Sequence, residues 1–74
     1  MSSEVIVPRF SSQGTILRNT TLFLNGGGAV TLQQGTRVEI LWTIEATGPL
    51  RLEVRVLDGK QRGRTGQVFA SDVQ

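Results

Sequence analysis

Positively charged side chains gather in one short stretch of the sequence, between positions 51 and 64. Five basic residues lie there against two acidic ones, so this stretch has a net charge of +3 while the whole chain has +2. Basic side chains that project from a β-hairpin can follow the phosphates of a nucleic acid and bind it without regard to sequence. They can equally form a solvated face and pair across strands with carboxylates such as Glu39 and Glu53. The five basic residues are Arg51, Arg55, Lys60, Arg62 and Arg64.

Aromatic side chains are few: one tryptophan, three phenylalanines and no tyrosine. A site for single-stranded nucleic acid needs exposed rings on which bases stack, and Phe23 and Phe69 are the candidates. Trp42 lies two positions from Ile40 and two from Ile44, and this period of two predicts a place in the core. Should its N–H end reach the surface, Trp42 becomes the best single candidate for a binding contact.

Catalytic groups are scarce in this chain. It contains no His, Cys or Tyr, which removes the commonest general base, the thiolate nucleophile and the usual zinc ligands. Glu39 and Glu53 are flanked by arginines, a pattern typical of surface pairs and not of a desolvated acid–base couple. The glycine run Gly26–Gly28 lacks the Lys-Ser/Thr pair of a phosphate-binding loop, so it predicts a turn. We therefore expect no enzyme, no catalytic residue, no metal site and no cofactor.

The length of 74 residues allows one domain with a small core. No apolar run approaches the roughly 20 residues of a membrane span. The first residues, Met1–Glu4, lack the basic region and the long apolar region of a signal peptide. These features predict a soluble, cytoplasmic protein that does not contact a membrane.

The elements that must position the basic side chains are β-strands. Residues 51–56 alternate polar and apolar without interruption, which is typical of a strand with one buried face. Asp58-Gly59 then favours a reversal because glycine accepts positive φ. Residues 64–69 are the predicted returning strand, and a short 3₁₀ turn is expected near Ala70 to Asp72.

Shorter strands are expected before this hairpin. They cover residues 15–18, 21–24, 29–32 and 36–45, with residues 11–14 as a turn or linker. In the longest of them, the predicted core face consists of Val38, Ile40, Trp42 and Ile44. Residues 5–7 are β-branched and stop at Pro8, which suits an edge strand. Five or six short strands in one domain predict an all-β barrel, at residues 14–74, after an N-terminal extension or edge strand at residues 1–13.

Four short motifs carry a family resemblance. They are Leu22–Asn25, Leu32–Leu41, Val54–Val56 and Gly63–Val73. In this order they resemble a bacterial SH3 (SH3b) domain, in which L-x-x-G-T-x-V-x-I-L leads into a main strand and R-T-G-x-V-x-A-S-x-V closes the barrel. The resemblance implies a small SH3-like barrel.

Two positions depart from the family. Gln67 stands where an aromatic residue is usual, and Asp72 stands where a tyrosine is frequent. Peptide-binding SH3 domains line their groove with Tyr, Trp and Pro. Since this chain has no tyrosine, we do not expect the groove that binds proline-rich peptides.

Three functions remain open from the residues and the resemblance. The first is a protein-interaction or assembly module that uses loops and a strand edge, at Val5–Phe10 or at Asp58–Arg64, and that could form a homo-oligomer. The second is a nucleic-acid-binding barrel that uses the five basic residues. The third is cell-wall or surface binding, which only the resemblance implies and which would require export.

Overall fold

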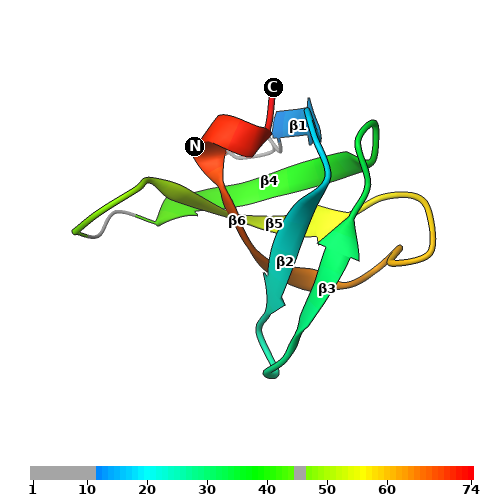
Figure 1. Cartoon of the computed structure of the whole chain (residues 1–74), viewed down its shortest axis with the longest axis horizontal. Helices are drawn as coiled ribbons and strands as arrows, with labels where there is room; N and C mark the ends of the chain where they lie inside the picture. Colours follow the sequence, from blue (N-terminus) through cyan, green and yellow to red (C-terminus); the bar gives the residue numbers. More distant parts are fainter. Residues whose placement is uncertain (1–11, 45–46) are drawn as a thin grey trace, which may run out of the picture.

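The computed structural model describes residues 12–44 and 47–74. In this part of the chain, six antiparallel strands form one sheet, and a single short 3₁₀ turn follows the last strand (Figure 1). The elements are β1 (Ser12–Thr15), β2 (Thr20–Leu24), β3 (Ala29–Leu32), β4 (Arg37–Ile44), β5 (Arg51–Val56), β6 (Thr65–Phe69) and η2 (Ala70–Asp72). The prediction of a small all-β, barrel-like fold is confirmed, including the position of the 3₁₀ turn. Within these residues, no helix is long and apolar enough to cross a bilayer.

The sheet is curled, and the chain that follows β6 returns to the end of β1. Its order is β1-β4-β5-β6-β2-β3, so that the central strands form a meander and the β2–β3 hairpin crosses over it (Figure 1). Ile16 forms an isolated bridge with Val73, and Thr15 exchanges two backbone hydrogen bonds with Gln74, at 3.1 and 3.0 Å. These contacts tie the segment after β1 to the segment after η2.

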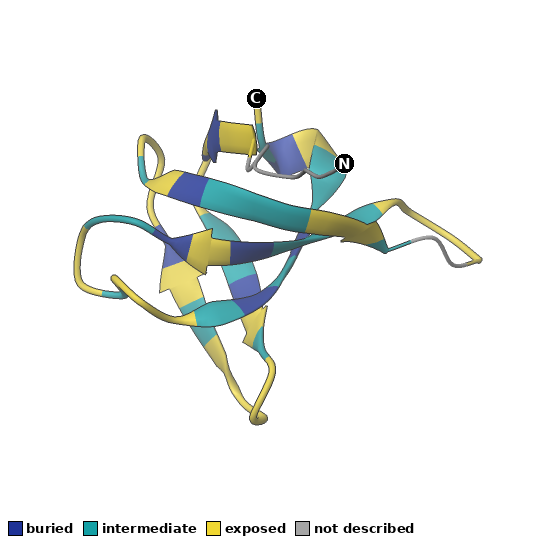
Figure 2. Ribbon diagram, turned by 180° about the vertical axis from the view of Figure 1, so that it is seen from behind, coloured by how far each residue is buried: buried dark blue, intermediate teal, exposed yellow. Residues whose placement is uncertain are grey.

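The core lies inside the curled sheet (Figure 2). Alternation along each strand places one side chain in two there. In β5, Val54 and Val56 are buried while Arg55 is exposed, and in β2, Leu22 is buried while Phe23 is 44% exposed. In the described part of the chain, the fully buried apolar residues are Ile16, Leu22, Leu32, Val38, Val54, Val56 and Val68.

The predicted core face of the longest strand is wrong at its second half. Val38 is buried and Ile40 packs against the core, but Trp42 is 58% exposed. The pairing of β4 with β5 shifts between Ile40 and Trp42, since Ile40 faces Val54 while Trp42 faces Glu53. One extra residue in a strand moves every later side chain to the other face of the sheet. Trp42 therefore lies on the outer face.

The first strand also differs from its prediction. We expected a turn or linker at residues 11–14 and a strand at residues 15–18, whereas β1 covers Ser12–Thr15. Its sequence has no apolar alternation, and it is a strand because it pairs with β4, from Ser12 opposite Ile40 to Thr15 opposite Arg37. The predicted edge strand at residues 5–7 and the interaction edge expected at Val5–Phe10 lie outside the described residues.

The predicted turns are confirmed at the glycines. Gly27 and Gly28 have φ of 104° and 85° in the β2–β3 turn. The β5–β6 connection covers residues 57–64, one residue more than predicted, and besides Gly59 it contains a second glycine with positive φ, Gly63. This loop carries three of the five basic residues.

Candidate functional site

The outer face of the sheet carries an aromatic patch, to which the register shift in β4 adds Trp42 and Ile44. Cross-strand partners share a face, so the pairing of Ile44 with Arg51 and of Arg51 with Phe69 places all three side chains on the outer side. Glu53 lies on the same side as Arg51, because it is two positions later in the same strand. Trp42 and Gln67 are the partners of Glu53, and Phe23 is the partner of Gln67, so these side chains share that side as well. We call Phe23, Trp42, Ile44, Arg51 and Phe69 the aromatic face.

A single row of paired residues crosses this face. Trp42 in β4 is opposite Glu53 in β5, which is opposite Gln67 in β6, which is opposite Phe23 in β2. Neighbouring strands lie about 4.8 Å apart, so the backbones that carry the two aromatic residues are separated by roughly 14 Å. Phe23 also meets Phe69 edge to face, with ring centroids 6.3 Å apart. The face thus presents rings with polar groups between them.

Arg51 is the charged member of the aromatic face. It is half-buried between the apolar neighbours Ile44 and Phe69 on the adjacent strands. Among the described residues it forms no salt bridge, whereas Arg55, four positions later, donates to Glu39 at 3.2 Å. A guanidinium whose stem rests on apolar side chains and whose head has no carboxylate can pair with an anionic group of a ligand.

The five basic residues do not form one patch. Arg51 lies at the beginning of β5, while Lys60, Arg62 and Arg64 lie in the loop beyond its end and are exposed (Figure 1). The length of β5 separates the two groups by roughly 17 Å. Of the predicted site residues, the structure therefore brings Trp42 and Arg51 onto one face and leaves the loop residues apart.

The acidic side chains of the described residues are already engaged. Glu39 pairs with Arg55, and Glu53 accepts from the Asn25 side chain at 2.8 Å instead of from an arginine. Asp58 and Asp72 pair with Arg37 and Arg18, at 3.2 and 3.0 Å. Four basic residues have no such partner in the described part of the chain, and they are Arg51, Lys60, Arg62 and Arg64. The surface therefore favours anionic ligands.

Asp58 holds the beginning of the basic loop against β4. Its carboxylate accepts from the backbone N–H of Arg37 at 3.1 Å and from Nε of Arg37 at 3.2 Å. The backbone hydrogen bond, and then the side-chain hydrogen bond, lower the pKa of the Asp58 carboxyl below its ordinary value.

This pKa shift predicts a pH dependence of stability. Because the pKa of Asp58 is lower in the folded chain, its contribution is present above the ordinary carboxyl pKa and is lost as the pH falls through the lowered value. Asp58→Asn removes the charge and keeps a side-chain oxygen for the Arg37 N–H. Thermal unfolding should show a lower midpoint for Asp58→Asn than for the wild type at pH 7, with a gap that closes below about pH 4. A gap that persists unchanged at pH 2 contradicts this prediction.

Some of these residues have no signal in the sequence. Ile44 looked like a core residue, and nothing in its neighbourhood announces the register shift. The outward position of Phe23 could be predicted from the sequence pattern, because Leu22 and Leu24 on either side point inward.

Within the described residues, no group of three or more Asp and Glu side chains is placed to hold a metal ion.

Comparison of the chain with protein-family models, with curated proteins and with solved structures finds no match.

Proposed function

We propose that the chain is a non-enzymatic interaction module that binds a protein partner through the aromatic face. One observation carries the proposal: the register shift in β4 turns Trp42 outward, 58% exposed, onto the same face of the sheet as Phe23, which is 44% exposed. Large apolar side chains that share an exposed surface mark interaction sites. Tryptophan and arginine are also the residues that most often dominate the binding energy of protein interfaces.

The arrangement supports a compact contact. Trp42 and Arg51 come from adjacent strands of a rigid sheet, so little conformational entropy is lost when a partner covers them. Glu53 and Gln67 lie between the rings and offer hydrogen-bonding groups within the same row. The resemblance to bacterial SH3 domains supports a binding module in general, and the proposed contact does not use a groove for proline-rich peptides.

Trp42→Ala tests this proposal. The wild-type and variant chains, immobilised in equal amounts, would capture proteins from an extract of the source organism for quantitative mass spectrometry. We expect at least one protein that the wild type retains and that Trp42→Ala loses by about 30-fold, which corresponds to the roughly 2 kcal/mol of a dominant interface residue. Stability should change little, because Trp42 is mostly exposed.

Gln34→Ala is the matched control, an exposed substitution in the β3–β4 turn. It should retain the same protein as the wild type. Equal capture by Trp42→Ala and wild type contradicts the proposal. Loss of the captured protein after nuclease treatment would assign the interaction to nucleic acid instead.

Nucleic-acid binding is the second candidate function. The observation that favours it is the set of basic side chains without carboxylate partners in the described residues, together with exposed rings on the same sheet. It predicts binding of a fluorescent oligo-dT strand that weakens steeply with salt, by about 0.7 in log K for each phosphate contact per unit of log salt concentration. Absence of binding at low salt eliminates this candidate.

A further inference from the structure

Among residues 12–44 and 47–74, the sheet ends at a strand edge that pairs with no further strand. β3 is the last strand in this part of the chain, and its one partner there is β2. The Leu24 N–H donates to the Gly28 carbonyl at 3.0 Å, so these two residues direct their backbone groups toward each other. That direction alternates from residue to residue along an antiparallel pair. Ala29 and Thr31 therefore turn their N–H and C=O groups away from β2, and neither has a backbone partner in the described part of the chain.

This edge lacks most of the features that usually block one. Proteins protect exposed edges with lysine, proline, bulges or a covering segment. The four residues of β3 are Ala, Val, Thr and Leu, and their register with β2 is regular from Thr20 to Phe23. The edge can thus accept the backbone of an added strand.

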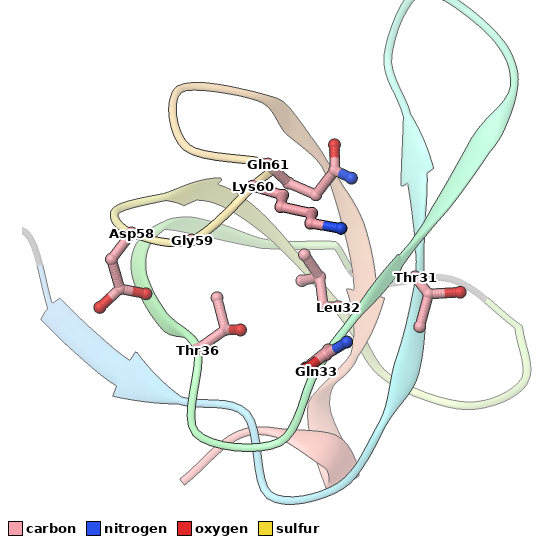
Figure 3. Close-up of a pocket in the computed structure, with 8 residues that line it drawn as sticks. All are labelled: Thr31, Leu32, Gln33, Thr36, Asp58, Gly59, Lys60 and Gln61. Carbon is pink, nitrogen blue, oxygen red and sulfur yellow. The ribbon is translucent and has the colours of Figure 1, made fainter.

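A cavity of about 250 Å³ lies at the carboxyl end of the same edge (Figure 3). The end of β3 and the turn after it contribute Thr31, Gln33 and Thr36, and the β5–β6 loop contributes Lys60 and Gln61. Leu32 also lines the cavity and belongs to the core. Hydroxyl and amide groups therefore surround a space about the size of one or two residues.

Lys60 supplies a positive charge to the cavity and so determines which charged groups can bind there. Asp58, two residues earlier in the loop, also lines the cavity, but its carboxylate points away from the Lys60 amino group and is engaged by Arg37 (Figure 3). Lys60 itself has no salt-bridge partner among the described residues. A positive group at the end of a strand edge favours a carboxylate there and disfavours an amino terminus.

From this juxtaposition we infer that the chain binds the free carboxyl end of an extended peptide, added as a parallel strand to β3 with its carboxylate beside Lys60. A peptide that ends in the cavity must run in the direction of β3, from Ala29 toward Gln33. Parallel pairing then lets one peptide residue bond to the Ala29 carbonyl and the Thr31 N–H. This site is separate from the aromatic face.

The experiment uses the full chain and two positional-scanning hexapeptide libraries, one with free carboxyl termini and one amidated. Binding of fluorescent pools is measured by anisotropy. We expect the preferred free-carboxyl pools to bind at least tenfold more tightly than their amidated counterparts. Lys60→Gln should remove this difference. If no free-carboxyl pool binds, or if both libraries bind equally well, the inference is overturned.

Thr31→Pro tests the backbone contact. Proline is tolerated where a strand N–H faces outward, yet it removes the donor that the added strand needs, so affinity should fall at least tenfold. Thr31→Val keeps the N–H and should stay within twofold of the wild type. If Thr31→Pro does not fold, amide hydrogen exchange of the wild type replaces it: the peptide should protect the Thr31 N–H, and unchanged exchange overturns the inference. Trp42→Ala should leave peptide binding intact, so this result and that of the proposed function are separable.

Discussion

Gly66→Ala should destabilise this protein by about 3 kcal/mol or more, since forcing extra volume into a tightly packed position displaces backbone. Gly66 is buried in β6, opposite Leu24 of β2 and Val54 of β5. A Cβ at this position would collide with the carbonyl oxygen of Phe23 and lie 2.9 Å from its carbonyl carbon. The neighbour is backbone and cannot rotate away, so β6 and β2 would have to separate at the point where the sheet curls.

Urea denaturation measures this effect against a matched control. Gly26→Ala introduces the same methyl group where nothing lies within 4 Å and where φ is not positive, so its stability should match or slightly exceed that of the wild type. A domain of this length is stable by roughly 4 to 11 kcal/mol. The loss in Gly66→Ala is therefore a large part of the total, and a loss below 1 kcal/mol would show that β2 and β6 are not packed this closely.

Asp72→Ala is expected to cost about 2 kcal/mol, the range for hydrogen bonds to a charged, mostly buried acceptor. Asp72 is 8% exposed in η2 and accepts from the Thr20 hydroxyl at 2.6 Å and from Nη1 of Arg18 at 3.0 Å. The side chain of Arg18 is 63% exposed, so its ion pair contributes little. Most of the lost stability therefore comes from the hydrogen bond with the Thr20 hydroxyl and from the packing of the buried carboxylate.

A double-mutant cycle separates these contributions. The loss in Asp72→Ala should shrink markedly in a Thr20→Val background, because the two side chains share one hydrogen bond. Ser71→Ala, an exposed neighbour in the same turn, should change the free energy of unfolding by less than about 0.5 kcal/mol. Losses from Asp72→Ala and Thr20→Val that simply add would show that this hydrogen bond does not stabilise the fold.

Both proposed binding surfaces depend on the close packing of β6 against β2 at Gly66. The contact at Gly66 joins β6 to β2 and so holds Phe23 beside Phe69 on the aromatic face. The same β2 supports β3, whose outer edge forms the inferred peptide site. A loss of the packing between β6 and β2 would therefore disrupt both surfaces, whereas the substitutions at Trp42 and Thr31 affect one surface each.

Most strands were predictable from local pattern. β5 alternates without a slip, and its Val54 and Val56 are buried as expected. The turns at glycines and the 3₁₀ turn after β6 were also predictable, because positive φ and chain reversal depend on a few adjacent residues. Alternating side chains and turn chemistry are local properties, and these segments keep them in the folded chain.

The positions of β1 and Trp42 were not predictable in this way. Nothing in Ser12–Thr15 favours a strand, and it becomes one through pairing with β4, about 25 residues further along the chain. In the sequence, Trp42 follows the same period of two as the core residues Val38 and Ile40. In the structure, the register shift between Ile40 and Trp42 turns its side chain to the outer face of the sheet. The split of the basic residues between two ends of β5 likewise follows from strand length and loop conformation.

Residue types and their spacing thus specified an all-β domain, its turns and the buried residues Val38, Val54 and Val56. Which residues form a surface depended on how distant segments paired. A strand's side chains alternate by two, so a shift of one residue in the β4–β5 register exchanges inside and outside. That shift arises from the pairing of the two strands and cannot be predicted from the residue pattern of either strand alone. Only the tertiary structure therefore shows that Trp42 and Arg51 share the outer face of the sheet.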